Sequence, residues 1–87
     1  MPRGTLSDLN TFLVVAERLS FRAAAAQLGL TSPAVSYSIR QLEERLGIRL
    51  LNRTTRSVSL TDAGRRLVDR LRPAMNQISG ALEDLYE

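Results

Sequence analysis

The amino-acid sequence predicts a mainly α-helical fold: a winged helix-turn-helix of three helices and a short β-hairpin, followed by one long helix. Three observations support this fold class. Apolar residues recur at three- and four-residue steps along successive segments, glycines separate the short segments, and an alternating apolar–polar stretch precedes the last one. Two short helices joined by a tight glycine turn and followed by a hairpin are typical of this fold.

The first helix is expected from Thr5 to about Arg18. Its apolar side chains, from Leu6 to Leu19, recur at helical spacing and therefore lie on one face. Thr5 is the expected N-cap. Asp8 completes a variant of the capping box, and its negative charge favours the positive end of the helix.

The second helix is expected at residues 21–28, with Ser20 as its N-cap. Its run of four alanines favours a helix and also lets the next helix cross closely. Gly29 is placed to end the helix in the left-handed conformation. Leu30 is then expected to fold back onto the core.

The third helix is expected to run to Leu46, with Thr31 as its N-cap and Gly47 as the residue that ends it. Pro33 lies in the first turn, where the N–H that proline lacks has no partner within the helix, so its absence costs nothing. At about 100° per residue, its aliphatic residues form one narrow buried stripe. That stripe consists of Val35, Ile39, Leu42 and Leu46. The opposite face carries Pro33, Ser36, Tyr37 and Arg40 and has no carboxylate through its first two turns.

The wing is expected at about residues 48–60, where the apolar runs 48–51 and 57–60 flank a polar loop. The loop is expected to carry Arg53 and Arg56 at its tip, with two threonines between them. Thr61 then caps a fourth helix that runs from residue 62 to about 85. A proline inside this helix should kink it or weaken one backbone hydrogen bond.

The fourth helix carries apolar side chains at alternating spacings of four and three residues, which is a heptad seam. The seam consists of Leu67, Leu71, Ala74, Ile78, Ala81 and Leu85, with Val68, Met75 and Leu82 alongside. Packing onto the first helix of the same chain accounts for the first two turns at most. The rest predicts a homodimer, with an interface of Leu67, Leu71, Ala74, Met75, Ile78, Leu82 and Leu85.

Several function classes are disfavoured by composition. The chain has no cysteine and no histidine, so we expect no disulfide, no metal centre and no cofactor. An enzyme is rejected, because carboxylates are not clustered and no base accompanies Ser36. The longest apolar run, residues 12–16, is far shorter than the ~20 residues of a membrane span, and the first residues lack the apolar segment of a signal peptide. A cytoplasmic protein without a membrane partner is expected.

Charge is distributed unevenly along the chain. All twelve basic residues are arginines, and residues 1–72 carry a net charge of +6 whereas residues 73–87 carry −3. This asymmetry favours a polyanionic partner, although a modest net charge also serves solubility. The exposed face of the third helix can donate hydrogen bonds to base edges and phosphates, and arginines on a thin wing can reach phosphates or a narrow minor groove. The alternative is an ordinary solvated helix face and loop.

These residues resemble the N-terminal DNA-binding domain of LysR-type transcriptional regulators. The matching positions are Ser20, Phe21, Ala24, Ala25, Leu28, Gly29, Thr31, Pro33, Ala34, Val35, Ser36, Ile39, Leu42, Glu43, Leu46, Gly47, Leu50, Arg53, Leu60, Thr61, Ala63 and Gly64. The resemblance implies a winged DNA-binding domain at residues 1–61, with its helix-turn-helix at about 21–40, and a dimerising linker helix at 62–87. It also implies a bacterial cytoplasmic, nucleoid-associated regulator.

The resemblance further implies that a dimer binds double-stranded DNA at an inverted repeat. The candidate DNA-contacting residues are Thr31, Ser32, Pro33, Ser36, Tyr37, Arg40, Arg53, Thr54 and Arg56. By analogy, positions 32, 33, 36 and 37 face bases, and the arginines meet phosphate or the minor groove. Many members carry arginine where this chain has Tyr37. A small-molecule effector is expected to act only through a C-terminal domain missing from this chain.

A second hypothesis comes from a different class: a winged-helix domain that binds a partner protein. Salt-dependent binding to DNA distinguishes the two hypotheses.

Overall fold

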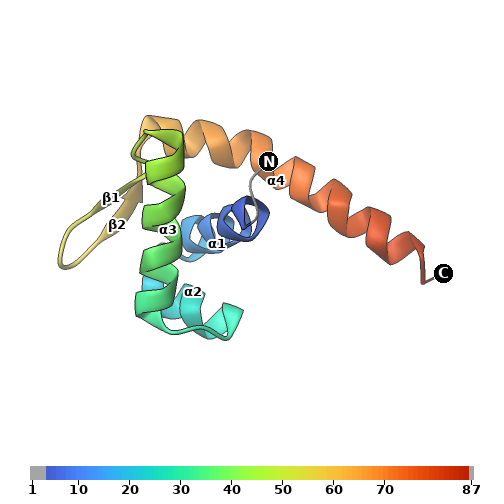
Figure 1. The fold of residues 1–87 in the computed structure, drawn as a ribbon, viewed down its shortest axis with the longest axis horizontal. Helices are drawn as coiled ribbons and strands as arrows, with labels where there is room; N and C mark the ends of the chain where they lie inside the picture. The colour runs from blue at the N-terminus through green and yellow to red at the C-terminus, as the bar shows by residue number, and fades with distance from the viewer. Residues whose placement is uncertain (1–3, 87) are drawn as a thin grey trace.

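The computed structural model describes residues 4–86, which form four helices and one hairpin. In chain order these are α1 (Thr5–Arg18), α2 (Phe21–Leu28), α3 (Ser32–Leu46), β1 (Leu51–Arg53), β2 (Val58–Leu60) and α4 (Asp62–Asp84). The helices α1, α2 and α3 pack against one another, and the hairpin projects to one side of them (Figure 1). We call these three helices and the hairpin the head. The predicted fold class is confirmed.

Three helices begin at the hydroxyl side chains that the sequence indicates. The Oγ atoms of Ser20, Thr31 and Thr61 accept hydrogen bonds from the backbone N–H three residues later, at 3.1, 3.2 and 3.0 Å. Each bond satisfies one of the N–H groups that a helix start leaves without a partner, and such a cap typically contributes about 1 kcal/mol.

The start of α1 differs from the prediction. Gly4 is the N-cap, in a left-handed conformation with φ 89°, and no side chain caps the helix. Thr5 lies inside the helix, and its buried Oγ1 has no hydrogen-bond partner among the described residues. The predicted capping box is therefore wrong. Its acidic member, Asp8, binds α3 instead, because that helix offers its carboxylate two donors.

Gly29 and Gly47 end α2 and α3 in the left-handed conformation, as predicted. After Gly29, the N–H of Leu30 donates to the carbonyl of Ala25 at 2.9 Å, which closes the turn. The prediction that Leu30 folds onto the core is wrong, because its side chain is 47% exposed. Ala25 and Leu28 already fill the side of α2 that faces the core.

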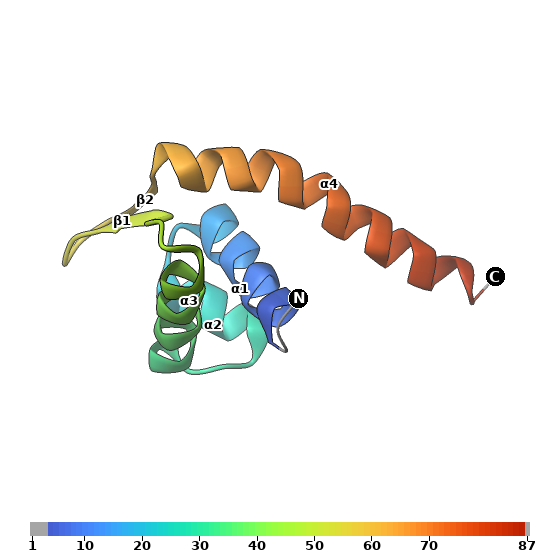
Figure 2. The same cartoon turned by 45° about the horizontal axis from the view of Figure 1, so that its top comes forward.

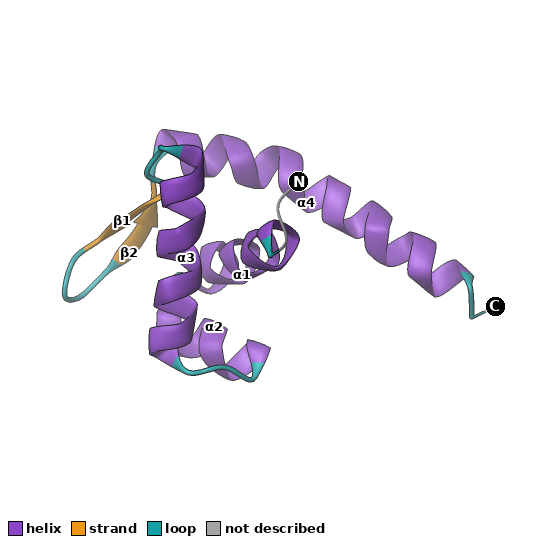
Figure 3. Cartoon of the chain, viewed as in Figure 1, coloured by secondary structure: helices purple, strands orange, loops and turns teal. Residues whose placement is uncertain are grey.

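The hairpin pairs Leu51 with Leu60 and Arg53 with Val58 in antiparallel register. Its first strand begins later than predicted. The reason is a carboxylate from α3: Oε2 of Glu43 accepts hydrogen bonds from the N–H groups of residues 50 and 51, at 2.8 and 3.2 Å. The connection from α3 is therefore bound to that helix, and the loop at the far end of the hairpin is shorter than predicted (Figure 3).

The core lies where α1, α2 and α3 meet. Its largest fully buried side chains are Phe12, Val15, Val35, Ile39, Leu42, Leu50 and Leu51. Leu46, predicted in the buried stripe of α3, is 45% exposed, because the last turn of α3 borders a groove beside α4 rather than the core. That part of the prediction is wrong.

The helix α4 starts beside the hairpin, runs over α1 and then leaves the head (Figure 2). Val68 is buried, and Leu67, Leu71 and Met75 pack partly buried against the core. Packing within the chain thus extends beyond the two turns predicted. The helix contains Pro73, and its ribbon bends partway along in both views, as a missing backbone N–H allows.

Among residues 4–86, no helix combines the length and the apolar character that crossing a membrane requires.

Candidate nucleic-acid interface

The outer face of α3 is open to solvent. Pro33, Tyr37 and Arg40 are exposed, Tyr37 by 60%, and Ser36 is half-buried. On the inner face Val35, Ile39 and Leu42 are fully buried, so the helix cannot rotate without breaking the core. At its start Thr31 is exposed and Ser32 is half-buried. The helical stripe predicted from the sequence thus separates the two faces correctly.

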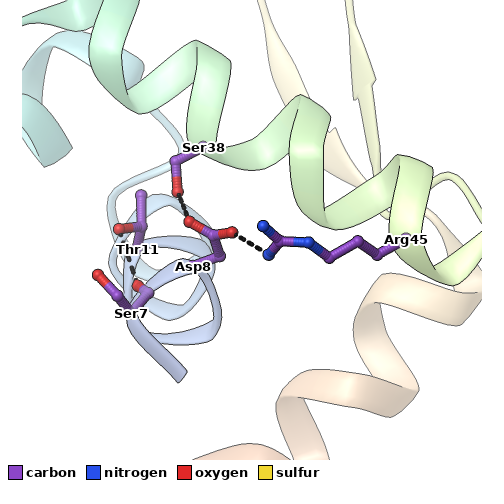
Figure 4. A network of polar contacts seen from close by, with 5 residues as sticks. All are labelled: Ser7, Asp8, Thr11, Ser38 and Arg45. Carbon is purple, nitrogen blue, oxygen red and sulfur yellow. Dashed lines mark hydrogen bonds and ion pairs between the residues drawn. The ribbon is translucent and has the colours of Figure 1, made fainter. Parts of the chain in front are cut away.

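A carboxylate on α1 fixes α3 from the side. Figure 4 shows Asp8 pointing from α1 toward α3, where its two oxygens accept hydrogen bonds from Ser38 Oγ at 2.7 Å and from an Nη atom of Arg45 at 2.6 Å. The Asp8 side chain is only 16% exposed. Hydrogen bonds to a charged group in such a partly buried position are among the stronger ones.

Sequence reasoning missed this network. Ser38 and Arg45 are seven residues apart and therefore lie on the same side of α3, so their spacing was a usable signal. The residue of α1 that faces Ser38 and Arg45 depends on the angle at which α1 crosses α3. That angle is set by the packing of the helices and cannot be derived from the residue pattern.

Arg53 does not lie at the wing tip, so that prediction is wrong. It belongs to β1, and its guanidinium group folds back toward α3, where an Nη atom donates to Ser36 Oγ at 2.7 Å. Its Cζ atom also lies 4.6 Å from the centre of the Phe21 ring, a distance typical of a cation–π contact. The arginine is drawn back because this ring and this hydroxyl together offer it two partners.

The wing tip is built around Thr54. Its Oγ1 accepts hydrogen bonds from the N–H groups of Arg56 and Ser57, at 3.2 and 3.0 Å, and its N–H donates to the Ser57 carbonyl at 2.9 Å. Thr54 therefore shapes the turn, and Arg56 projects from it as an exposed side chain.

The arginines on the outer face of α3 and on the wing have no acidic side chain paired with them among the described residues. Among residues 4–86 there are two ion pairs, Arg45 with Asp8 at 2.6 Å and Arg72 with Glu17 at 3.8 Å. Neither involves an arginine of the outer face of α3 or of the wing. These guanidinium groups stay available for an anionic partner.

Comparison with known proteins assigns the chain to a family. Residues 6–65 match the model of bacterial regulatory helix-turn-helix proteins of the lysR family. In Escherichia coli K12, the uncharacterized HTH-type transcriptional regulator YcaN is 57% identical over 85 residues, covering 98% of this chain and 28% of YcaN. The regulator PgrR of the same organism is 48% identical over 87 residues, covering 100% of this chain and 29% of PgrR. The chain thus spans less than a third of either relative.

Solved structures give the same result. The oxidized form of Corynebacterium glutamicum OxyR superposes with a TM-score of 0.89 at 33% identity, covering 97% of this chain and 27% of that one. A complex of the BenM DBD with catB site 1 DNA gives 0.84 at 33% identity, covering 90% and 84%. A CbnR DBD–DNA complex gives 0.80 at 31% identity, covering 92% and 91%. The chain belongs to the lysR family of bacterial regulatory helix-turn-helix proteins.

Proposed function

We propose that this chain is the DNA-binding part of a LysR-type transcriptional regulator that acts on double-stranded DNA in the bacterial cytoplasm. The observation that carries this proposal is the outer face of α3, which is exposed, free of carboxylates through its first two turns and flanked by arginines without acidic partners. A helix of this kind fits the major groove. The two DBD–DNA complexes among the similar structures support the same role.

The side chains divide into two groups by what they can bind. Pro33 and Tyr37 project from α3 and can contact thymine methyl groups and base edges, while Arg40 reaches a base or a phosphate. Ser32 and Ser36 are half-buried, so they contact DNA only with their exposed atoms. Thr31 and Thr54 mainly shape the backbone that approaches the DNA.

The two wing arginines have different roles in this proposal. Arg56 projects from the tip and is suited to phosphate or to a narrow minor groove. Arg53 lies against Ser36 and therefore approaches DNA together with the start of α3. In this proposal Arg53 lies beside the bases and Arg56 contacts the DNA backbone further along.

We also propose that the chain acts as a homodimer through α4. Its second half exposes Ile78, Leu82 and Leu85, by 43, 57 and 76%. Fully burying one such side chain contributes roughly 1.5–3 kcal/mol, so two stripes of them can hold a dimer at micromolar concentration. A twofold dimer then recognises an inverted repeat.

Selection of bound sequences from a random DNA pool, followed by a salt titration, tests the DNA-binding role. We expect an enriched inverted repeat whose affinity falls with salt concentration, because phosphate contacts release counterions. No enriched sequence and an affinity independent of salt would favour the protein-interaction alternative.

The dimer is tested by sedimentation of the chain and of a variant with Ile78→Asp and Leu82→Asp, both in the exposed half of α4. At about 50 µM we expect roughly twice the monomer mass of 9.7 kDa for the parent chain and a monomer for the variant. Leu30→Asp is the control, since Leu30 is similarly exposed and comes just before the start of α3, whereas α4 begins beside the other end of that helix (Figure 1). A monomeric parent chain would contradict the proposal.

A further inference from the structure

Glu43, near the end of α3, binds the connection that leads from this helix to the hairpin. Its Oε2 atom accepts hydrogen bonds from the N–H groups of Leu50 and Leu51, at 2.8 and 3.2 Å. Its backbone carbonyl accepts two more, from Gly47 at 2.8 Å and from Ile48 at 3.3 Å. Four N–H groups of the connection therefore donate to this one residue.

The carboxylate of Glu43 has no cationic partner among residues 4–86, where the ion pairs are those of Asp8 and Glu17. It is half-buried and lines the same open pocket as Arg40, which is proposed above to contact DNA. A negative charge beside such a residue repels phosphate and opposes DNA binding. What Glu43 contributes must therefore come from the N–H groups that it binds.

These N–H groups belong to the root of the wing, where the chain passes from α3 to the hairpin (Figure 3). Leu51 is the first residue of β1 and pairs with Leu60 of β2. The carbonyl of Leu50 accepts a hydrogen bond from the N–H of Thr61, which follows β2, at 3.0 Å. The carboxylate thus holds β1 directly and holds β2 through its bonds to the first strand.

A second contact fixes the wing against α3 nearer the start of that helix. An Nη atom of Arg53 donates to Ser36 Oγ at 2.7 Å. Ser36 and Glu43 are seven residues apart and therefore lie on the same side of α3, about 10 Å apart along the axis at roughly 1.5 Å per residue. Two acceptors on one side of α3 thus bind two points of β1, which sets the angle between the wing and the helix.

We propose that Glu43 is a positioning residue for DNA binding. It holds the wing at the angle at which Arg56 reaches the DNA while α3 lies in the major groove, and it does not contact DNA itself. The physical reason is that a wing free to swing loses this freedom on binding, which lowers the affinity, whereas a wing already held does not. This inference rests on the DNA-binding function proposed above and adds a residue that acts through the wing.

The carboxylate orients the wing but is not needed to keep the head folded. The side chains of Leu50 and Leu51 are 2 and 1% exposed, so the apolar core retains the root of the wing without it. Because the pocket beside Glu43 is open to solvent, water can bind the two N–H groups when the carboxylate is removed. Substitution should therefore change the angle of the wing and leave the helices intact by circular dichroism.

The position of the wing is measured without DNA. The chain has no cysteine, so spin labels attached at Arg40→Cys on α3 and Arg56→Cys on the wing report the distance between these two sites. We expect a narrow distribution of distances for the labelled parent and a clearly wider one after Glu43→Ala. Glu43→Gln should stay narrow, because its amide oxygen can replace Oε2, the one atom that accepts both bonds. Equally narrow distributions for all three proteins would overturn the proposal.

The sign of the change in DNA affinity separates positioning from charge. Removing a carboxylate near DNA ordinarily strengthens binding, because repulsion of phosphate is lost. We expect Glu43→Ala to weaken binding about tenfold at low salt and Glu43→Gln to stay within about threefold of the parent. The matched control is Glu44→Ala, which removes the same charge from the adjacent, exposed position and should not weaken binding. Equal affinities of Glu43→Ala and Glu44→Ala would contradict the proposal.

Glu43→Asp completes the comparison. It keeps the charge but is one methylene shorter, so it loses reach to the two N–H groups and should weaken binding more than Glu43→Gln does. If Glu43→Ala does not fold, this pair of variants decides the question. Tighter binding by the aspartate variant than by the glutamine variant would show that charge, and not position, is what matters.

A double-mutant cycle with Arg56 tests whether the effect passes through the wing. In the parent, Arg56→Ala should reduce the slope of log affinity against log salt by roughly one. In the Glu43→Ala background it should change slope and affinity much less, because the released wing already contributes little. Equal effects in the two backgrounds would contradict this inference alone. A parent chain that does not bind DNA would contradict the proposed function as well.

Discussion

Replacing Asp8 by alanine should destabilise the head substantially, although the residue is not part of the apolar core. The substitution removes two hydrogen bonds, to Ser38 at 2.7 Å and to Arg45 at 2.6 Å. A bond to a charged group contributes about 1.5–3 kcal/mol when buried, and an exposed ion pair about 0.2–1 kcal/mol. The carboxylate is 16% and the guanidinium 36% exposed, so the bond to Ser38 dominates. We expect a loss of about 2 kcal/mol in total.

Urea denaturation followed by circular dichroism measures this loss. We expect a lower midpoint with an unchanged slope, and a melting temperature about 8–16 °C lower, since 1 kcal/mol corresponds to about 4–8 °C for a domain of this size. The matched control is Glu17→Ala, whose pair with Arg72 spans 3.8 Å between half-exposed side chains. It should cost at most about 0.5 kcal/mol. Equal midpoints for the two variants would refute the reasoning.

Four further predictions concern DNA binding. Arg40→Ala should weaken binding by about 1–3 kcal/mol with the fold intact; overlapping binding isotherms would remove Arg40 from the interface. Arg56→Ala should weaken binding on most sequences and reduce the slope of log affinity against log salt by roughly one; an unchanged slope would place the wing off the DNA. Tyr37→Arg should shift selected sites toward guanine at one symmetric pair of positions, because arginine binds guanine with two hydrogen bonds; identical selected motifs would exclude this. Phe21→Leu should retain the fold but weaken DNA binding about as much as Arg53→Ala, because the ring positions the guanidinium group; unchanged affinity would show that this contact does not matter for DNA.

The sequence predicted local features well. Ser20, Thr31 and Thr61 cap their helices through a backbone group only three residues away, and glycines 29 and 47 end theirs through their own backbone conformation. These interactions depend on neighbouring residues, so the residue pattern is sufficient to place them. The helical repeat likewise identified the buried and exposed faces of α3.

Two of the failures share one cause, which is competition from partners distant in sequence. Asp8 was assigned to its own helix start, but α3 binds it across thirty positions. Arg53 was assigned to a loop tip, but Phe21 and Ser36 draw it back. Neither of these choices can be made until the crossing angles of the helices are known.

The close contact at the start of α4 sets the geometry of any dimer. A Cβ atom on Gly64 would lie 2.1 Å from the Leu50 carbonyl oxygen, so the helix leaves the head in a direction that a larger residue would change. With 23 residues, α4 is about 34 Å long at roughly 1.5 Å per residue, similar to the 34–36 Å of one turn of DNA. The contact at Gly64 therefore fixes where α4 begins, and the length of α4 fixes how far its other end lies from the head. In the proposed dimer, one extra residue between the head and the seam of α4 would move each head by about 1.5 Å along its helix and rotate it by about 100°, in both copies at once. The spacing and the helical phase of the two DNA half-sites would therefore both depend on where α4 begins.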